Sequence, residues 1–203
     1  MFDAFLRALK DRLLAPVARA IGTRVHPNAV TISAWFVGLL AAVAAGGRDY
    51  RLALCLWVTN RVLDGFDGTL SRVTGTQTDF GGYLDIVLDF SVYAMLVFGL
   101  ILGSKTWQTA AAGTALVGTF YVNAASWMYL AAILERRELG ASATGERTTV
   151  TMPPGLIAGT ETFGFYVLFL LIPGHLPLLF TLMGVGVVAT IIQRIVWARR
   201  CLA

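Results

Sequence analysis

Six apolar runs dominate this sequence, and each has about the length needed to cross a membrane. About 20 helical residues, at roughly 1.5 Å per residue, span the ~30 Å of hydrocarbon in a bilayer. Hydrophobic residues make up 57% of the 203 positions and charged residues only 14%, which excludes an ordinary soluble domain. The sequence therefore predicts an all-α integral membrane protein with six transmembrane helices. The runs lie near residues 30–46, 51–70, 82–103, 107–134, 155–173 and 176–197.

The segment before the first run, residues 1–25, predicts an amphipathic helix on the membrane surface. Its apolar residues recur at helical spacing, while the basic residues fall between them. These apolar residues are Phe2, Phe5, Leu9, Leu13 and Val17. A short soluble helix with a charged face is the alternative. Residues 26–203 would then form a six-helix bundle, and we expect residues 1–203 to be a single membrane domain.

Basic residues are unevenly distributed over the two sides of the predicted bundle. If both termini lie on one side, that side holds every Lys and Arg except Arg48, Arg51 and Lys105. The positive-inside rule then places both termini in the cytoplasm, and we expect a bacterial-type inner membrane. The net charge of +4 is explained by this topology, so we expect no nucleic-acid partner.

Four aspartates interrupt two of the apolar runs, where an ionisable group is costly and indicates function. Asp64 and Asp67 lie toward the end of the second run, and Asp85 and Asp89 lie near the start of the third. All four should therefore lie at a similar depth, near the cytoplasmic face. Because residues three or four apart share a helix face, the two pairs can face each other across antiparallel helices. We expect the four carboxylates to converge.

Such a cluster stays ionised only if cations neutralise it. Because it contains no His or Cys, it favours hard cations such as Mg²⁺, Mn²⁺ or Ca²⁺ over zinc. Paired carboxylates could bind two ions, as suits phosphoryl transfer, and Arg72 nearby could bind a phosphate or act as an interfacial anchor. A cation transporter or channel that uses membrane carboxylates is the alternative from another functional class.

The aspartates belong to a longer pattern, Asp64-x2-Asp67-Gly68-x2-Ser71-Arg72-x8-Gly81-x3-Asp85-x3-Asp89. This pattern closely resembles the signature of the CDP-alcohol phosphotransferase family, D-x2-D-G-x2-A-R-x8-G-x3-D-x3-D. It departs only at Ser71, where the family usually has Ala. The stretch "HPNAVT" at 26–31 is similar to the family's Pro-Asn-x-x-Thr, and a surface helix followed by six spans resembles the family architecture.

The resemblance implies an enzyme that transfers a substituted phosphate from a CDP-linked donor to an alcohol and releases CMP. It also implies divalent metal, which we expect to be two Mg²⁺ or Mn²⁺ ions, and a homodimer. Carried over residue by residue, it makes Asp64, Asp67 and Asp85 metal ligands, and Asp89 the catalytic base and a further ligand. The positions that resemble contacts to the CDP group are Asn28, Thr31, Gly68, Ser71, Arg72, Thr78 and Gly81.

The family leaves the substrates open. CDP-diacylglycerol is the expected donor, and a soluble CDP-alcohol with a lipid acceptor is the alternative within the family. After Asp85 the chain reads "IVLDFSVYAML", without the Pro and Lys of the D-P-x-A-D-K that glycerophosphate-using members typically show. This difference argues against a standard phosphatidylglycerophosphate synthase.

Two groups of residues outside the signature are candidates for binding the acceptor alcohol. Glu161 is expected about two turns into the fifth run, at a depth similar to that of Asp89; alternatively it pairs with Arg61 or another buried basic group. Arg136, Arg137 and Arg194 could form a pocket for a phosphate on the acceptor, as in inositol-phosphate-using members. Positive-inside anchoring would explain these arginines equally well.

Overall fold

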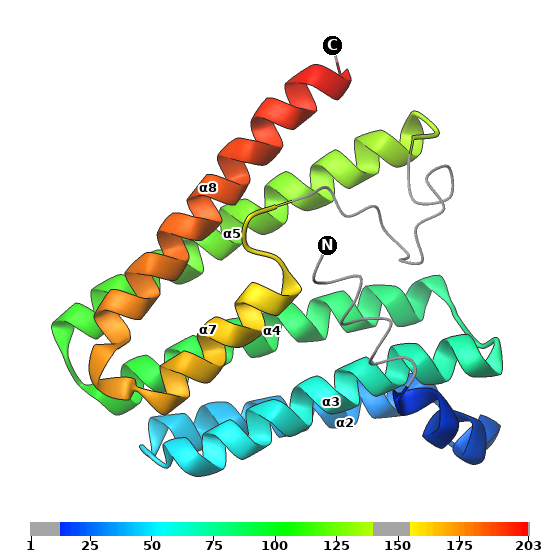
Figure 1. The fold of residues 1–203 in the computed structure, drawn as a ribbon, viewed down its shortest axis with the longest axis horizontal. Coiled ribbons are helices and arrows are strands. Elements are labelled where there is room, and N and C mark those ends of the chain that lie inside the picture. The colour runs from blue at the N-terminus through cyan, green and yellow to red at the C-terminus, as the bar shows by residue number, and fades with distance from the viewer. Residues whose placement is uncertain (1–12, 140–154, 203) are drawn as a thin grey trace. The chain divides into compact units, whose positions relative to one another are not determined.

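The structure is a computed structural model that describes residues 13–139 and 155–202 (Figure 1). Helices make up almost all of the described chain, and those residues contain no strand. Residues 13–21 are helical and continue into the short 3-10 helix η1, Gly22–Arg24. The remaining elements are α2 (Pro27–Gly46), α3 (Tyr50–Thr74), α4 (Asp79–Ser104), α5 (Trp107–Arg136), α7 (Gly159–Leu171), η2 (Pro173–His175) and α8 (Leu176–Leu202).

Four of these helices are long and apolar enough to cross a membrane: Pro27–Gly46, Asp79–Ser104, Trp107–Arg136 and Pro173–Leu202. The prediction of an all-helical membrane protein is therefore confirmed, whereas six spans remain a prediction. α3 falls outside this set, and its second half carries Arg61, Asp64, Asp67 and Arg72. α7 has only 13 residues, or about 20 Å of helix, which is shorter than the hydrocarbon layer.

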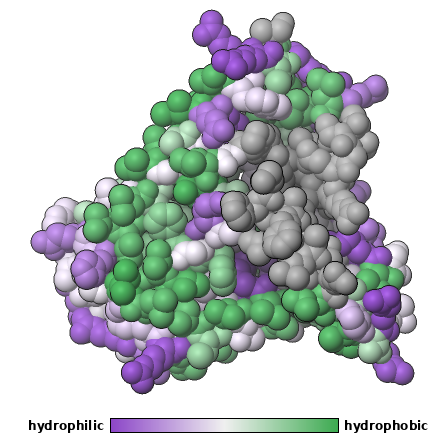
Figure 2. Space-filling view, viewed as in Figure 1, coloured by the Kyte–Doolittle hydropathy of each residue, from purple (hydrophilic) through white to green (hydrophobic). Residues whose placement is uncertain are grey.

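Large apolar side chains on the outer faces of the helices fit this interpretation. Figure 2 shows broad areas of hydrophobic surface. Val43 and Leu102 are examples on two of the spanning helices, with exposed fractions of 71% and 70%. Leu13 and Val17, expected on the apolar face of a surface helix, are also exposed. The first twelve residues of that predicted helix lie outside the described residues, so the surface helix remains a prediction.

Polar residues at the ends of the apolar runs set the helix boundaries. His26 precedes α2 and its side chain accepts a hydrogen bond from the Asn28 backbone, while Pro27 takes the first helical position. α3 ends at Thr74 and is capped by Gly75, which has a φ of 66°. Thr78 then caps α4 by accepting a hydrogen bond from the Gly81 backbone at 3.0 Å. These caps lie beyond the ends of the apolar runs. The helices α3 and α4 are therefore longer, and the link between them is shorter, than hydropathy predicts.

The chain forms two compact units. One contains the residues up to 106 together with Tyr166–Gly174, and the other contains Trp107–Phe165 and the residues from His175 on. α7 contributes to both units. The prediction that residues 1–203 form a single domain stays a prediction.

In the first unit, α2 packs closely against both α3 and α4. The contact with α4 depends on small residues, because a Cβ atom at Gly99 would collide with the Ala42 carbonyl and one at Gly103 with the Ala45 carbonyl. Glycine and alanine thus bring the two backbones together, as small residues commonly do between membrane helices. This packing joins the last turns of α4 to the end of α2, about 15 Å along α4 from Asp89.

In the second unit, α5 packs against α8. The segment before α7 is attached to α8, because the Ile157 backbone donates a hydrogen bond of 2.9 Å to the Thr190 hydroxyl. The Ile157 side chain lies directly over Gly186, where an added Cβ atom would be 2.8 Å from it. These contacts fix the start of α7.

We predict that Gly99→Ala destabilises the protein, because the added methyl group meets a backbone carbonyl that cannot rotate away. Overpacking of this kind should lower the free energy of unfolding by about 1–3 kcal/mol. Thermal unfolding of the purified protein in detergent would show it as a lower midpoint. The matched control is Gly118→Ala on α5, where no atom of the described residues lies within 4 Å of the added atom and stability should be kept or raised. Equal midpoints for both variants would contradict the prediction.

Candidate active site

The aspartates of α3 and α4 come together in the first unit, as their helical spacing predicts. Asp64, Asp85 and Asp89 each offer a carboxylate oxygen, and these oxygens all lie within 4.8 Å of one another. All three residues are partly buried. Three like charges this close repel each other strongly where water is scarce, so the cluster requires compensating positive charge.

Asp67 is the most buried of the four aspartates, with 5% of its surface exposed. It is not one of the three whose oxygens meet, but it interacts electrostatically with Asp64 and Asp85 and lies beside Thr31 of α2. The structure therefore places it at the edge of the cluster, next to one of the positions expected to contact the CDP group.

The carboxylates fit a divalent cation. Asp67 Oδ2 and Asp85 Oδ1 are both buried, and neither has a hydrogen-bond partner in the part of the chain that the structure describes. Such orphaned oxygens are rare in folded proteins, because burying an unsatisfied polar atom costs free energy. An oxygen-only ligand set suits Mg²⁺ or Mn²⁺. Asp64, Asp67, Asp85 and Asp89 are the residues that would hold metal here.

Two of the positions expected around CDP form a clear pair on α3. The Arg72 guanidinium lies over Gly68, where an added Cβ would come within 3.2 Å of its Nη1. Arg72 also donates to the Thr69 hydroxyl at 3.3 Å. Ser71 uses its hydroxyl to donate to the Gly68 carbonyl in its own helix, at 3.0 Å. Gly68 thus leaves room for a guanidinium that could bind phosphate.

The remaining expected positions lie where α2 meets the start of α4. A Cβ at Gly81 would be 3.2 Å from Asn28 Oδ1 and 3.1 Å from Thr78 Oγ1. The structure therefore brings Asn28, which is distant in sequence, next to Thr78 and Gly81. Thr78 also has a structural role as the cap of α4, and the Thr31 hydroxyl donates to the Pro27 carbonyl at 3.2 Å.

Arg61 is a site residue that sequence reasoning missed. Its guanidinium binds both oxygens of Asp89, with Nη2 2.7 Å from Oδ1 and Nη1 3.1 Å from Oδ2. Nη1 also lies 3.7 Å from Asp64 Oδ2. A signal was present in the sequence, because Arg61 is three residues before Asp64 and such pairs share a helix face. From the sequence, Arg61 is expected only as a possible partner of Glu161.

Glu161 is not two turns into a helix, as hydropathy predicts. It is the third residue of α7, and its carboxylate accepts a hydrogen bond of 3.1 Å from the Ala158 backbone. This is the reciprocal bond of a capping box, which satisfies a free N–H at the helix start. The apolar run began earlier than the helix because residues 155–158 are apolar or small without being helical.

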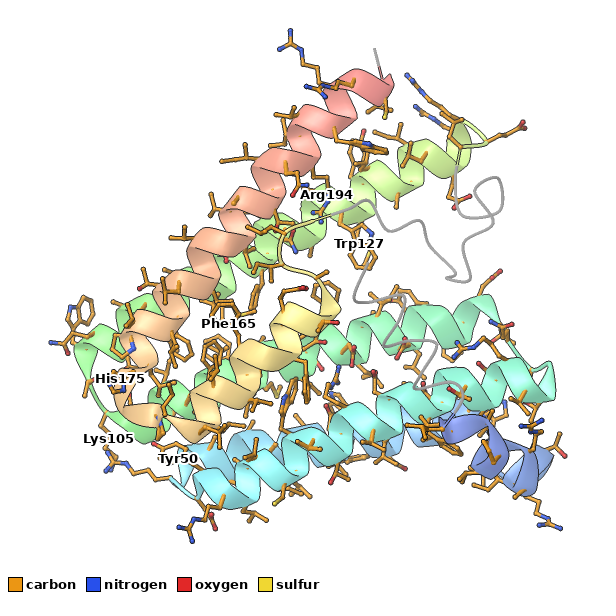
Figure 3. The ribbon with its side chains drawn as sticks, viewed as in Figure 1. Tyr50, Lys105, Trp127, Phe165, His175 and Arg194 are labelled. Carbon is orange, nitrogen blue, oxygen red and sulfur yellow. The ribbon has the colours of Figure 1, made fainter. Side chains whose placement is uncertain are left out.

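The three arginines expected to bind an acceptor phosphate do not form one pocket. Arg194 is buried on α8 and points toward α5, where its Nη1 donates to Asn123 Oδ1 and to Ser126 Oγ at 2.8 Å each (Figure 3). Arg136 lies ten residues beyond Ser126 on α5, or about 15 Å along the helix. Arg137 is exposed and donates to the Leu202 carbonyl at 3.2 Å, near the end of α8.

Comparison with known proteins identifies the family. Residues 24–195 match the family described as CDP-alcohol phosphatidyltransferase. The chain belongs to this family. Its members are transferases of phosphate-containing groups, and the protein is therefore an enzyme. The matched residues include the whole aspartate pattern.

Two relatives illustrate the range of the CDP-alcohol phosphatidyltransferase family. Inner membrane protein YnjF of Escherichia coli is 33% identical over 174 residues, which cover 85% of this chain and 83% of YnjF. The archaetidylinositol phosphate synthase of Pyrococcus horikoshii is 32% identical over 100 residues, or 49% of this chain. The match spans only 52% of that synthase.

Solved structures of one family member share the fold. The phosphatidylinositol phosphate synthase of Mycobacterium tuberculosis, in a crystal structure with CDP-DAG bound, superimposes with a TM-score of 0.71 at 20% identity. The match covers 92% of this chain and 94% of that one. A second crystal structure of that synthase is a complex with manganese and citrate, with a TM-score of 0.70 at 20% identity over 91% of this chain and 88% of that one.

We predict that Asp85→Asn uncouples the stability of the protein from divalent metal. Mn²⁺ should raise the thermal midpoint of the unsubstituted protein, because a ligand that binds the folded state stabilises it. The substitution removes one carboxylate from the repelling cluster, so the metal-free midpoint should rise while most of the response to Mn²⁺ is lost. Thermal unfolding with EDTA and with Mn²⁺ measures both effects.

The control for this experiment is Asp79→Asn in the exposed first turn of the same helix. This variant should keep the full response to Mn²⁺. A response in Asp85→Asn equal to that of the unsubstituted protein would exclude Asp85 as a metal ligand.

Proposed function

We propose that the protein transfers the phosphatidyl group of CDP-diacylglycerol to an alcohol acceptor and releases CMP. The observation that carries this proposal is the convergence of the signature aspartates in a chain of this family. The donor is supported by the structural relative from M. tuberculosis, which was solved with CDP-DAG bound. A site among apolar helices suits a donor whose acyl chains stay in the bilayer.

Each side chain has a defined part in this reaction. Asp64, Asp67, Asp85 and Asp89 would hold two divalent ions, Mg²⁺ or Mn²⁺, which supply positive charge for the pyrophosphate and the leaving CMP. Arg72, over Gly68, is placed to bind a donor phosphate. Asn28, Thr31, Ser71, Thr78 and Gly81 would surround the rest of the CDP group.

Asp89 is the proposed base. It accepts the proton of the acceptor hydroxyl as the oxygen forms a bond to the phosphorus nearer the lipid. The bond between that phosphorus and the bridging pyrophosphate oxygen breaks, and CMP leaves. The carboxylate of Asp89 is oriented by Arg61 and lies close to those of Asp64 and Asp85.

We also propose the topology and assembly that this reaction requires. Six spans, with both termini and the carboxylate cluster near the cytoplasm, would give a water-soluble nucleotide access to the site. An inner-membrane location is supported by the E. coli relative, inner membrane protein YnjF. Assembly as a homodimer is expected from the family resemblance.

A CMP-release assay tests the proposed function. The purified protein is incubated with Mn²⁺ or Mg²⁺ and CDP-diacylglycerol, across a panel of serine, glycerol 3-phosphate, inositol, inositol phosphate and sugar alcohols. We expect CMP release with one acceptor class, and a loss of at least about 10²-fold in Asp89→Asn, because general-base catalysis typically contributes that much. Near-normal turnover in Asp89→Asn would remove the base assignment.

The same assay separates the alternatives. Release of CMP from CDP-choline with a lipid acceptor, but not from CDP-diacylglycerol, would indicate the soluble-donor alternative. Cation flux into proteoliposomes without turnover of either donor would indicate a transporter. If folded protein releases no CMP from any CDP donor, the proposed transferase activity is rejected.

For the acceptor, we propose that Arg194 binds a phosphate group. It is 6% exposed, and its described hydrogen bonds go to neutral groups. Within residues 13–139 and 155–202 its Nε has no hydrogen-bond partner and its guanidinium has no acidic partner. A buried cation in such surroundings is well suited to an anionic ligand. Glu161 and Arg137 are weaker candidates because each already bonds the backbone of its own unit. Arg136 lies too far along α5 to share a pocket with Arg194.

We predict that Arg194→Gln raises KM for a phosphorylated acceptor by about tenfold or more, because hydrogen bonds to charged groups contribute about 1.5–3 kcal/mol. Neutral acceptors should be affected much less. Steady-state CMP release with inositol phosphate and with inositol compares the two. Arg199→Gln, on the exposed last turn of α8, is the control and should leave both values unchanged. An equal change for both acceptors would indicate that Arg194 is structural.

A further inference from the structure

The guanidinium of Arg61 has several close partners. Its Cζ lies 4.8 Å from the ring centroid of Trp57 and 5.1 Å from that of Tyr93, and these two rings pack edge to face beside it. Its Nε donates to Asn60 Oδ1 at 2.7 Å, and its Nη1 donates to the Tyr93 hydroxyl at 3.0 Å. Together with the two bonds to Asp89, these contacts leave the side chain little freedom to rotate.

The groups around Arg61 are themselves anchored. Asn60 donates to the Ala34 carbonyl of α2 at 2.7 Å, which ties the Arg61 end of α3 to that helix. Tyr166 stacks on Trp57 at a centroid distance of 4.8 Å and donates to the Tyr93 carbonyl at 2.8 Å. Trp57 and Tyr166 have no exposed surface. An assembly of this size around one guanidinium indicates a position that must be fixed.

Arg61 also sets the charge of the site. Among the described residues, it makes both of the ion pairs in the cluster, to Asp64 and to Asp89. Four ionised carboxylates against one guanidinium remain negative, so they can attract metal. One divalent ion leaves a small negative charge, and two make the site positive, as a pyrophosphate donor requires.

We propose that Arg61 is a positioning residue for Asp89 and a fixed counter-charge for the carboxylate cluster. This inference rests on the proposed function for the role of Asp89. Arg61 holds the Asp89 carboxylate by both oxygens, whereas Asp67 and Asp85 keep buried oxygens free for metal. The aspartates therefore differ in their tasks: a guanidinium orients Asp89, whereas Asp67 and Asp85 each keep a buried oxygen available for metal.

The two roles predict opposite effects of one substitution. Arg61→Gln removes a positive charge beside the metal ligands and releases Asp89, so Mn²⁺ should bind about tenfold or more tightly. Turnover should nevertheless fall by about 10²-fold or more, because Asp89 loses its orientation. A purely structural residue would instead weaken Mn²⁺ binding and turnover together. Calorimetry or electron paramagnetic resonance in detergent measures Mn²⁺ binding without any turnover.

Arg61→Lys separates the charge from the geometry. It keeps the positive charge, so Mn²⁺ affinity should stay near that of the unsubstituted protein. It cannot bind both carboxylate oxygens in the same planar arrangement, so kcat should still fall by about tenfold. The control is Arg51→Gln on the exposed first turn of the same helix, which should change neither quantity.

The outcomes are decisive for each part. Weaker Mn²⁺ binding in Arg61→Gln would overturn the proposed role of Arg61 as a counter-charge. An unchanged kcat in both Arg61→Lys and Arg61→Gln would overturn its proposed role in positioning Asp89. If the unsubstituted protein releases no CMP from any donor, the proposed function fails and the positioning role fails with it. The comparison of Mn²⁺ affinities still decides the counter-charge in that case.

Discussion

The repulsion among carboxylates held between apolar helices is the constraint on which this structure depends. Ionised groups removed from water raise the free energy of the fold unless opposite charge reaches them. The chain supplies part of that charge through Arg61, which binds Asp89 in a bidentate pair. The orphaned oxygens of Asp67 and Asp85 are the part that remains uncompensated. Metal binding and the stability of the first unit are therefore expected to be linked.

Close backbone packing keeps this charged cluster in place. Gly99 and Gly103 let the end of α4 approach α2, while Asn60 ties α3 to the Ala34 carbonyl of α2. The aromatic residues Trp57, Tyr93 and Tyr166 fill the space beside Arg61. Each of these contacts lies within the first unit, so the carboxylates and their supporting shell form one local structure.

The meeting of the carboxylates could be predicted from the sequence because side chains three or four residues apart share one face of an α-helix. The spacing of Asp64, Asp85 and Asp89 was enough to predict that their carboxylates meet. Features that depend on capping or on long side chains were harder to predict. Hydropathy predicts Glu161 two turns into a helix, whereas the helix begins only at Gly159 and the Glu161 carboxylate caps its first turn. Arg136 and Arg194 are predicted on the same side of the membrane. Arg194 nevertheless contacts Ser126, which lies about 15 Å along α5 from Arg136. Arg61 was overlooked because a flexible side chain can reach several partners, and only packing selects one.

Ser71 illustrates how a departure from a family pattern can be chemically silent. Its hydroxyl is satisfied by the Gly68 carbonyl one turn back along its own helix. A polar group that closes on its own backbone makes no demand on a substrate and needs no new partner from a neighbouring helix. Serine can therefore stand where alanine is usual without altering what the site recognises. Divergence within this family should be interpreted by where each new polar atom finds its hydrogen bond, and not by the change of residue type alone.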